Sequence, residues 1–110
     1  MLAEEPHPAD LLATAREVLL NELLPALPPD KAFAARMVAN AMAIAGRAAA
    51  QPAWEAAALA RIPGDPAAFA AAIRAGRYDP GTPGHAEAAA LLDDITRARC
   101  AVSAPKAIAP

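Results

Sequence analysis

Residues 36–50 read "RMVANAMAIAGRAAA", a stretch made almost entirely of small and apolar side chains. Alanine is the strongest helix former, because its side chain loses no rotamer freedom when the helix forms. The stretch therefore predicts a long helix that begins near Asp30, a good N-cap residue, and ends near Ala50. A helix that is apolar nearly all round is usually central in its bundle.

Three polar side chains interrupt this predicted helix, namely Arg36, Asn40 and Arg47. At about 100° per residue they fall along one edge of an apolar face. That face, which we expect to point into the core, is formed by Phe33, Met37 and Ile44. The three polar side chains are then expected to be half-buried, which is costly for an arginine without a partner.

The polar cluster has a structural and a functional interpretation. In the first, Arg36 pairs with Glu22 of the preceding helix, with Asn40 completing the hydrogen bonds and Glu17 as the second choice of partner. Antiparallel packing of neighbouring helices would bring these groups together. In the second, the Arg36/Asn40/Arg47 edge binds an anion, since the arginine fork suits phosphate or carboxylate. A third interpretation is a solvated edge without a particular role, and the sequence leaves all three open.

Proline and glycine divide the rest of the chain into further helices. Breaks are expected near residues 25–29, 51–52, 63–65 and 76–82. Asp65 with Pro66 should start one helix, Gly76 should close it, and Thr82 with Pro83 should start the last.

The fold class is all-α, a small helical bundle of four to five helices. The 110 residues fit a single domain, with 1–7 and 104–110 as flexible or draped tails. Alanine supplies 35 residues and Val, Ile and Thr together 11, which favours helix over strand, although the coding bias of a GC-rich genome explains part of the excess. The first, second and last helices are expected to form the core.

Composition excludes several function classes. The net charge of −2 argues against a nucleic-acid interface, and no apolar run reaches the ~20 residues of a membrane span. A single cysteine and an acidic start without a signal-peptide pattern favour the cytoplasm.

No catalytic or metal-binding pattern stands out, and no cofactor is expected. His7 and His85 lack ligand-like spacing, and Cys100 is expected to be structural. Asp93 and Asp94 are adjacent, so a helix turns them about 100° apart, which is poor geometry for an acid–base pair.

A family resemblance rests on four stretches, "HPADLLATAREVLLNELLPAL", "FAARMVANAMAIAGRAAA", "IRAGRYD" and "RCAVSAPKAI". In order and spacing they resemble the bacterial family called domain of unknown function 6285. The matching positions are Arg36, Asn40, Arg47, Arg74 and Gly76. The tail departs from the pattern, because Cys100, Ala104 and Ala107 stand where the family has Leu, Asn and Tyr.

The resemblance implies a small helical protein or module without known catalytic residues. It also implies an association with aminoglycoside-phosphotransferase-like kinases or acyl-CoA dehydrogenases. Two functions remain open: a non-catalytic accessory or interaction module, and a binder of acyl-thioester or phosphate-bearing metabolites that uses the Arg36/Asn40/Arg47 edge. A homodimer is also possible, and the expected contact residues are Leu20, Leu24, Trp54 and Leu59.

Overall fold

The computed structural model describes residues 4–51 and 53–110, which form five α-helices and no β-strand. This confirms the predicted all-α class. The helices are α1 (Pro8–Val18), α2 (Ala32–Ala50), α3 (Trp54–Arg61), α4 (Pro66–Arg74) and α5 (His85–Ser103). Short 3-10 turns lie at Leu24–Ala26, Pro29–Lys31 and Pro105–Ala107. None of these helices combines the length and the hydrophobicity needed to cross a membrane.

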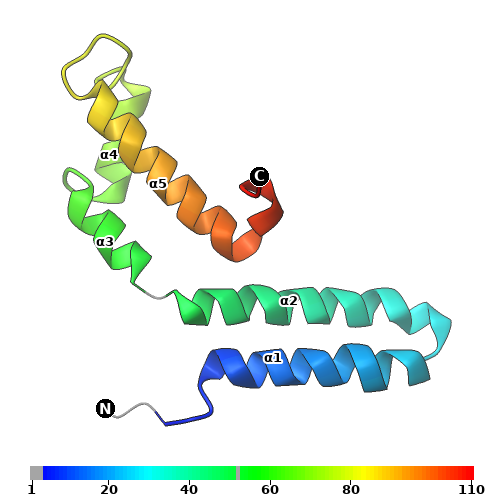
Figure 1. Ribbon diagram of the computed structural model, residues 1–110. Helices are drawn as coiled ribbons and strands as arrows, with labels where there is room; N and C mark the ends of the chain where they lie inside the picture. The colour runs from blue at the N-terminus through cyan, green and yellow to red at the C-terminus, as the bar shows by residue number, and fades with distance from the viewer. Residues whose placement is uncertain (1–3, 52) are drawn as a thin grey trace. The chain divides into compact units, whose positions relative to one another are not determined.

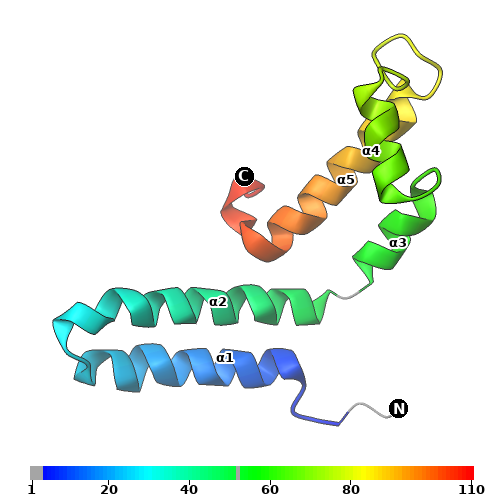
Figure 2. The same ribbon diagram turned by 180° about the vertical axis from the view of Figure 1, so that it is seen from behind.

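The chain divides into two compact units, Met1–Pro52 and Ala53–Pro110. In the first unit α1 and α2 lie side by side and run in opposite directions (Figures 1 and 2). The expectation of one domain with a core shared by the first, second and last helices stays a prediction. The flexible tail over 104–110 also stays a prediction, and the structure has one 3-10 turn there. Pro52, which belongs to the break predicted at 51–52, lies outside the described residues.

The first helix continues past Val18 into a π-helical turn, Leu19–Leu23. The backbone N–H of Leu24 donates to the carbonyl of Leu19, five residues back instead of four. This turn holds one residue more than an α-helical turn, so the side chains that follow it are rotated about the axis. A wheel drawn at 3.6 residues per turn therefore misplaces Glu22.

Small residues bring α2 close to α1. The buried side chains of α2 are Ala35 and Ala39, and none of α1 is fully buried. About two helical turns after Ala39, a Cβ added to Gly46 would lie 3.8 Å from the Cβ of Leu12. Phe33 and Met37 lie about 200° round the helix from Ala35 and Ala39. The predicted core face of α2 is therefore wrong, because the helix presents its smallest side chains to α1.

The Gly46→Ala variant is expected to be more stable than the wild type. Glycine inside a helix costs roughly 0.5–1 kcal/mol relative to alanine, and the new methyl group would be in ordinary contact with Leu12 at 3.8 Å. A shift of the urea midpoint followed by circular dichroism measures the gain. The matched control is Ala45→Gly at an exposed site of the same helix. This variant should lose about as much stability as Gly46→Ala gains. A destabilised Gly46→Ala variant would mean that the helices need a closer approach than 3.8 Å allows.

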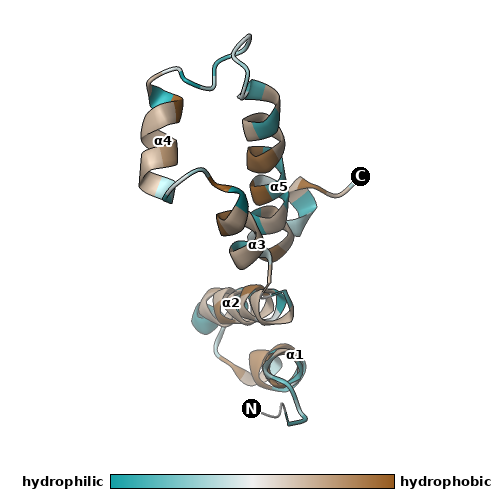
Figure 3. Ribbon diagram, turned by 90° about the vertical axis from the view of Figure 1, so that its left-hand side faces the viewer, coloured by the Kyte–Doolittle hydropathy of each residue, from teal (hydrophilic) through white to brown (hydrophobic). Residues whose placement is uncertain are grey.

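In the second unit, the core lies where α4 and α5 meet. Phe69, Ala88 and Leu91 are buried, and half-buried Ile95 and Tyr78 pack against them. The rings of Phe69 and Tyr78 meet edge to face at 5.3 Å between centroids. Figure 3 shows the middle of α4 in hydrophobic colours, whereas polar segments recur along α5.

The ends of α4 confirm the sequence prediction. The Asp65 carboxylate accepts a hydrogen bond from the backbone N–H of Ala68 at 2.7 Å, as an N-cap does. Gly76 has a φ of +82°, and the N–H groups of Gly76 and Arg77 donate to the carbonyls of Ile73 and Ala72. This is the Schellman arrangement that glycine favours.

Two other helices begin within three residues of their predicted starts, but the predicted residues do not cap them. Asp30 lies in a 3-10 turn ahead of α2, which begins at Ala32 without a side-chain cap. The last helix begins at His85, because Thr82 is held in the preceding loop, where its hydroxyl donates to the Asp79 carbonyl at 2.7 Å.

Candidate functional site

Most of the predicted polar cluster lies in solvent. Arg36, Asn40, Glu17 and Glu22 are exposed, and Arg47 is half-buried. The expectation of half-burial is therefore wrong for Arg36 and Asn40, because α2 turns Ala35 and Ala39, not its polar edge, towards α1. Whether the cluster has a structural or an anion-binding role stays a prediction.

Arg36 and Glu22 do not form the predicted ion pair. Within residues 4–51 and 53–110, the ion pairs join Arg61 to Asp94 and Arg97 to Asp93. Glu22 sits in the π turn, and Arg36 is about 100° round the helix from buried Ala35. The π turn changes the direction of Glu22, and Arg36 lies off the contact because α2 meets α1 through Ala35 and Ala39.

A polar contact between α1 and α2 comes from Arg16, which the sequence analysis missed. Its Nε donates to the backbone carbonyl of Ala39 at 3.1 Å. Arg16 follows Leu12 by four residues, so both share the face of α1 that points to α2. The four-residue spacing from Leu12 could have identified Arg16. It was overlooked because only apolar residues were expected on the face of α1 that contacts α2.

A groove runs between α1 and α2 near the start of the first helix and the end of the second. Its volume is about 320 Å³. It is lined by Ala9, Leu12, Ala13, Arg16, Met42, Ala43, Gly46, Arg47 and Ala50. Arg47 is the one member of the predicted cluster that the structure places in this groove.

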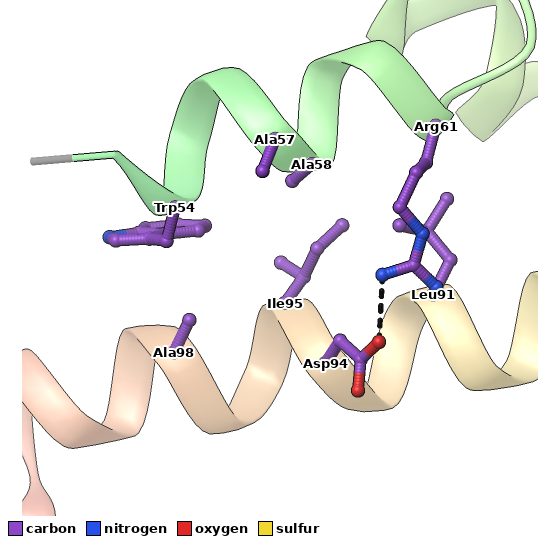
Figure 4. Close-up of a pocket in the computed structure, with 8 residues that line it drawn as sticks. All are labelled: Trp54, Ala57, Ala58, Arg61, Leu91, Asp94, Ile95 and Ala98. Atoms are coloured by element: carbon purple, nitrogen blue, oxygen red, sulfur yellow. Dashed lines mark hydrogen bonds and ion pairs between the residues drawn. The ribbon is translucent and has the colours of Figure 1, made fainter.

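A second, smaller groove lies between α3 and α5 and has a volume of about 170 Å³ (Figure 4). The Trp54 ring forms one end, and Ile95 projects between the helices. Near the other end the Arg61 guanidinium donates to the Asp94 carboxylate at 2.7 Å. The guanidinium carbon of Arg99 lies 5.8 Å from the centroid of the Trp54 ring, within cation–π range.

The remaining candidates have structural contacts. Asp93 forms an ion pair with Arg97, one helical turn further on, at 3.0 Å. Its neighbour Asp94 pairs with Arg61, so the two adjacent aspartates bind different arginines. His85 Nδ1 lies 2.8 Å from the Tyr78 carbonyl, and Cys100 is half-buried. Among the described residues no three His, Cys, Asp or Glu side chains gather in a way that could hold a metal ion.

Comparison with known proteins gives one match. The sequence model of the family described as Domain of unknown function (DUF6285) matches residues 25–107. The match takes in α2 to α5 and starts after the π turn, so the resemblance over residues 7–24 stays a prediction. No curated protein and no solved structure matches the chain. The family model covers more than half of the sequence, and the chain therefore belongs to the DUF6285 family.

Proposed function

We propose that this chain is a non-catalytic helical interaction module and that the outward face of α2 is its docking surface. The observation that carries the proposal is the exposure of large apolar side chains there. Phe33 is 74% exposed and Met37 is 53% exposed, one helical turn apart on the side of α2 that faces away from α1. Apolar side chains at this spacing are what a partner groove or helix recognises.

The charges on α2 indicate the chemistry of the partner. Arg36 is the exposed charged side chain of α2, whereas Arg47 lines the groove beside α1, and the sequence of α2 contains no carboxylate. Complementary charge steers association and suppresses wrong partners. The surface that fits this face is therefore apolar at its centre and acidic at its rim. A second α2 would bring arginines towards arginines and fits less well.

The class of partner follows from the family resemblance. It supports an aminoglycoside-phosphotransferase-like kinase or an acyl-CoA dehydrogenase that carries such an acidic, apolar surface. A cytoplasmic location, which the single cysteine favours, is part of the same proposal.

The double variant Phe33→Glu/Met37→Glu is expected to lose partner binding without losing stability. Both side chains are already mostly in water, at 74% and 53% exposure, so folding depends little on them. The test uses the purified chain with a kinase and a dehydrogenase of the two classes from its own organism, by calorimetry. The matched control is Leu11→Glu, an exposed apolar site on α1, which should bind like the wild type.

Each outcome of this test decides the proposal. Binding that the double variant loses and Leu11→Glu keeps supports the α2 face. Equal binding by all three proteins overturns the surface, and wild-type failure with both enzymes overturns the partner class. Sedimentation of the same samples shows whether the chain forms a homodimer. A dimer that the double variant abolishes would make a second copy the occupant and overturn the proposal of a different partner.

A further inference from the structure

We propose that a second copy of this chain binds in a groove of the second unit, so that two copies form a homodimer with a two-fold axis. The groove lies between α3, the start of α4 and α5, and its volume is about 260 Å³. Its apolar walls include Trp54, Leu59, Ile62 and Ile95. It shares Trp54 and Ile95 with the groove of Figure 4 and contains no residue of the outward face of α2.

Helix α3 is short and buries little of its own apolar surface. None of its eight residues, 54–61, is buried, and no side chain caps its first turn. Isolated helices shorter than about 12–15 residues are marginal in water, so α3 depends on the apolar contacts that it makes. Leu59 is its one large aliphatic side chain, and it is 54% exposed. A surface that covers Leu59 and the groove beside it would therefore stabilise this helix.

Two charges of opposite sign indicate that the occupant is a copy of the same chain. Glu55 on α3 and Arg99 on α5 both line the groove and are exposed. Within residues 4–51 and 53–110, the Glu55 side chain has no hydrogen bond or ion pair, and the Arg99 side chain has only its cation–π contact with Trp54. A strongly acidic or strongly basic partner would be repelled by one of the two charges. A second copy carries both opposite charges on one surface.

A two-fold axis makes this surface complementary to itself. In such an interface residue i of one copy contacts residue j of the other, and j contacts i. Glu55 of each copy then meets Arg99 of the other, and Leu59 of each copy enters the apolar groove of the other. A small molecule fits less well, since 260 Å³ lies below the usual range of about 300–1,000 Å³ for ligand sites.

The first test measures the dimer by analytical ultracentrifugation of the full chain. The wild type should sediment as a dimer at high concentration, and dilution should expose Trp54 and shift its fluorescence to longer wavelength. Leu59→Glu should weaken the dimer by about tenfold or more, because it places a carboxylate in an apolar groove. Leu92→Glu is the matched control, since Leu92 is a 40% exposed residue of α5 that does not line the groove. A monomeric wild type, or equal effects of the two variants, overturns the proposal.

Charge reversal then identifies the ion pair between the copies. Glu55→Arg sets arginine against arginine, and Arg99→Glu sets glutamate against glutamate, so each variant alone should lose about tenfold or more in dimer affinity. An equimolar mixture of the two variants restores opposite charges at both contacts and should form a heterodimer about as stable as the wild-type dimer. Both residues are exposed, so circular dichroism should show the same fold in all samples. A mixture that associates no better than either variant alone would refute the contact between Glu55 and Arg99.

The Phe33→Glu/Met37→Glu variant separates this inference from the proposed function. It should keep the dimer, because neither residue lines the groove. A dimer that survives in this variant while enzyme binding is lost supports both surfaces. Loss of the dimer in this variant would place the second copy on α2 and overturn the inference.

Discussion

Replacing Phe69 by alanine is expected to lower the free energy of unfolding by about 3–5 kcal/mol, the largest effect of any single substitution considered. Phe69 is 5% exposed and packs against buried Leu91 and Ala88. Truncation removes its burial, leaves a cavity and ends the edge-to-face contact with Tyr78 at 5.3 Å. The second unit is small, so it has little else with which to replace this contact.

The measurement uses the only tryptophan of the chain. Trp54 lies in the same unit as Phe69, so its fluorescence during urea unfolding reports on that unit. The matched control is Phe33→Ala, the same change at a residue that is 74% exposed, and it should shift stability by less than about 0.5 kcal/mol. Equal losses from the two variants would contradict the position of the core.

Gly76→Ala is expected to destabilise the protein by about 1–2 kcal/mol through its backbone alone. Its φ of +82° is a left-handed conformation that alanine adopts poorly, and the C-terminal hydrogen bonds of α4 depend on it. A Cβ at this position would also lie 2.9 Å from Oδ2 of Asp79, so that carboxylate would have to move.

Gly64→Ala separates the two causes. Gly64 has a similar φ of +74°, but an added Cβ would meet no atom within 4 Å. It should therefore show the backbone cost alone, and thermal unfolding of both variants gives the difference. Gly76→Ala should lose more stability than Gly64→Ala. The difference should be smaller than the backbone cost itself, because the Asp79 side chain can rotate away from the new Cβ. A neutral Gly76→Ala variant would contradict the left-handed turn.

The sequence predicted where most helices lie because local chemistry decides it. The prolines after Leu24 and Ile62 and the left-handed Gly76 act on their own neighbours, wherever the rest of the chain is. Asp65 likewise caps α4 through a bond to Ala68, only three residues away. Such signals need no knowledge of packing.

The packing faces could not be predicted in the same way. On an alanine-rich helix, the few large side chains dominate any wheel, so Phe33 and Met37 looked like the core. The two helices instead meet through Ala35 and Ala39, because small side chains allow the backbones to approach. The predicted polar cluster was wrong for two reasons. The edge that bears Arg36 was placed beside a core face taken from that wheel, and Arg16 was not included in the cluster.

The π-helical turn at Leu19–Leu23 also bears on how this chain is compared with its relatives. An i to i+5 hydrogen bond, here from Leu24 to Leu19, encloses one residue that an α-helix does without. Removing one residue here restores ordinary α-helical geometry and keeps the helix continuous. A relative one residue shorter in this region can therefore keep both ends of the helix, and the alignment gap belongs inside the helix, not in the proline-rich loop that follows.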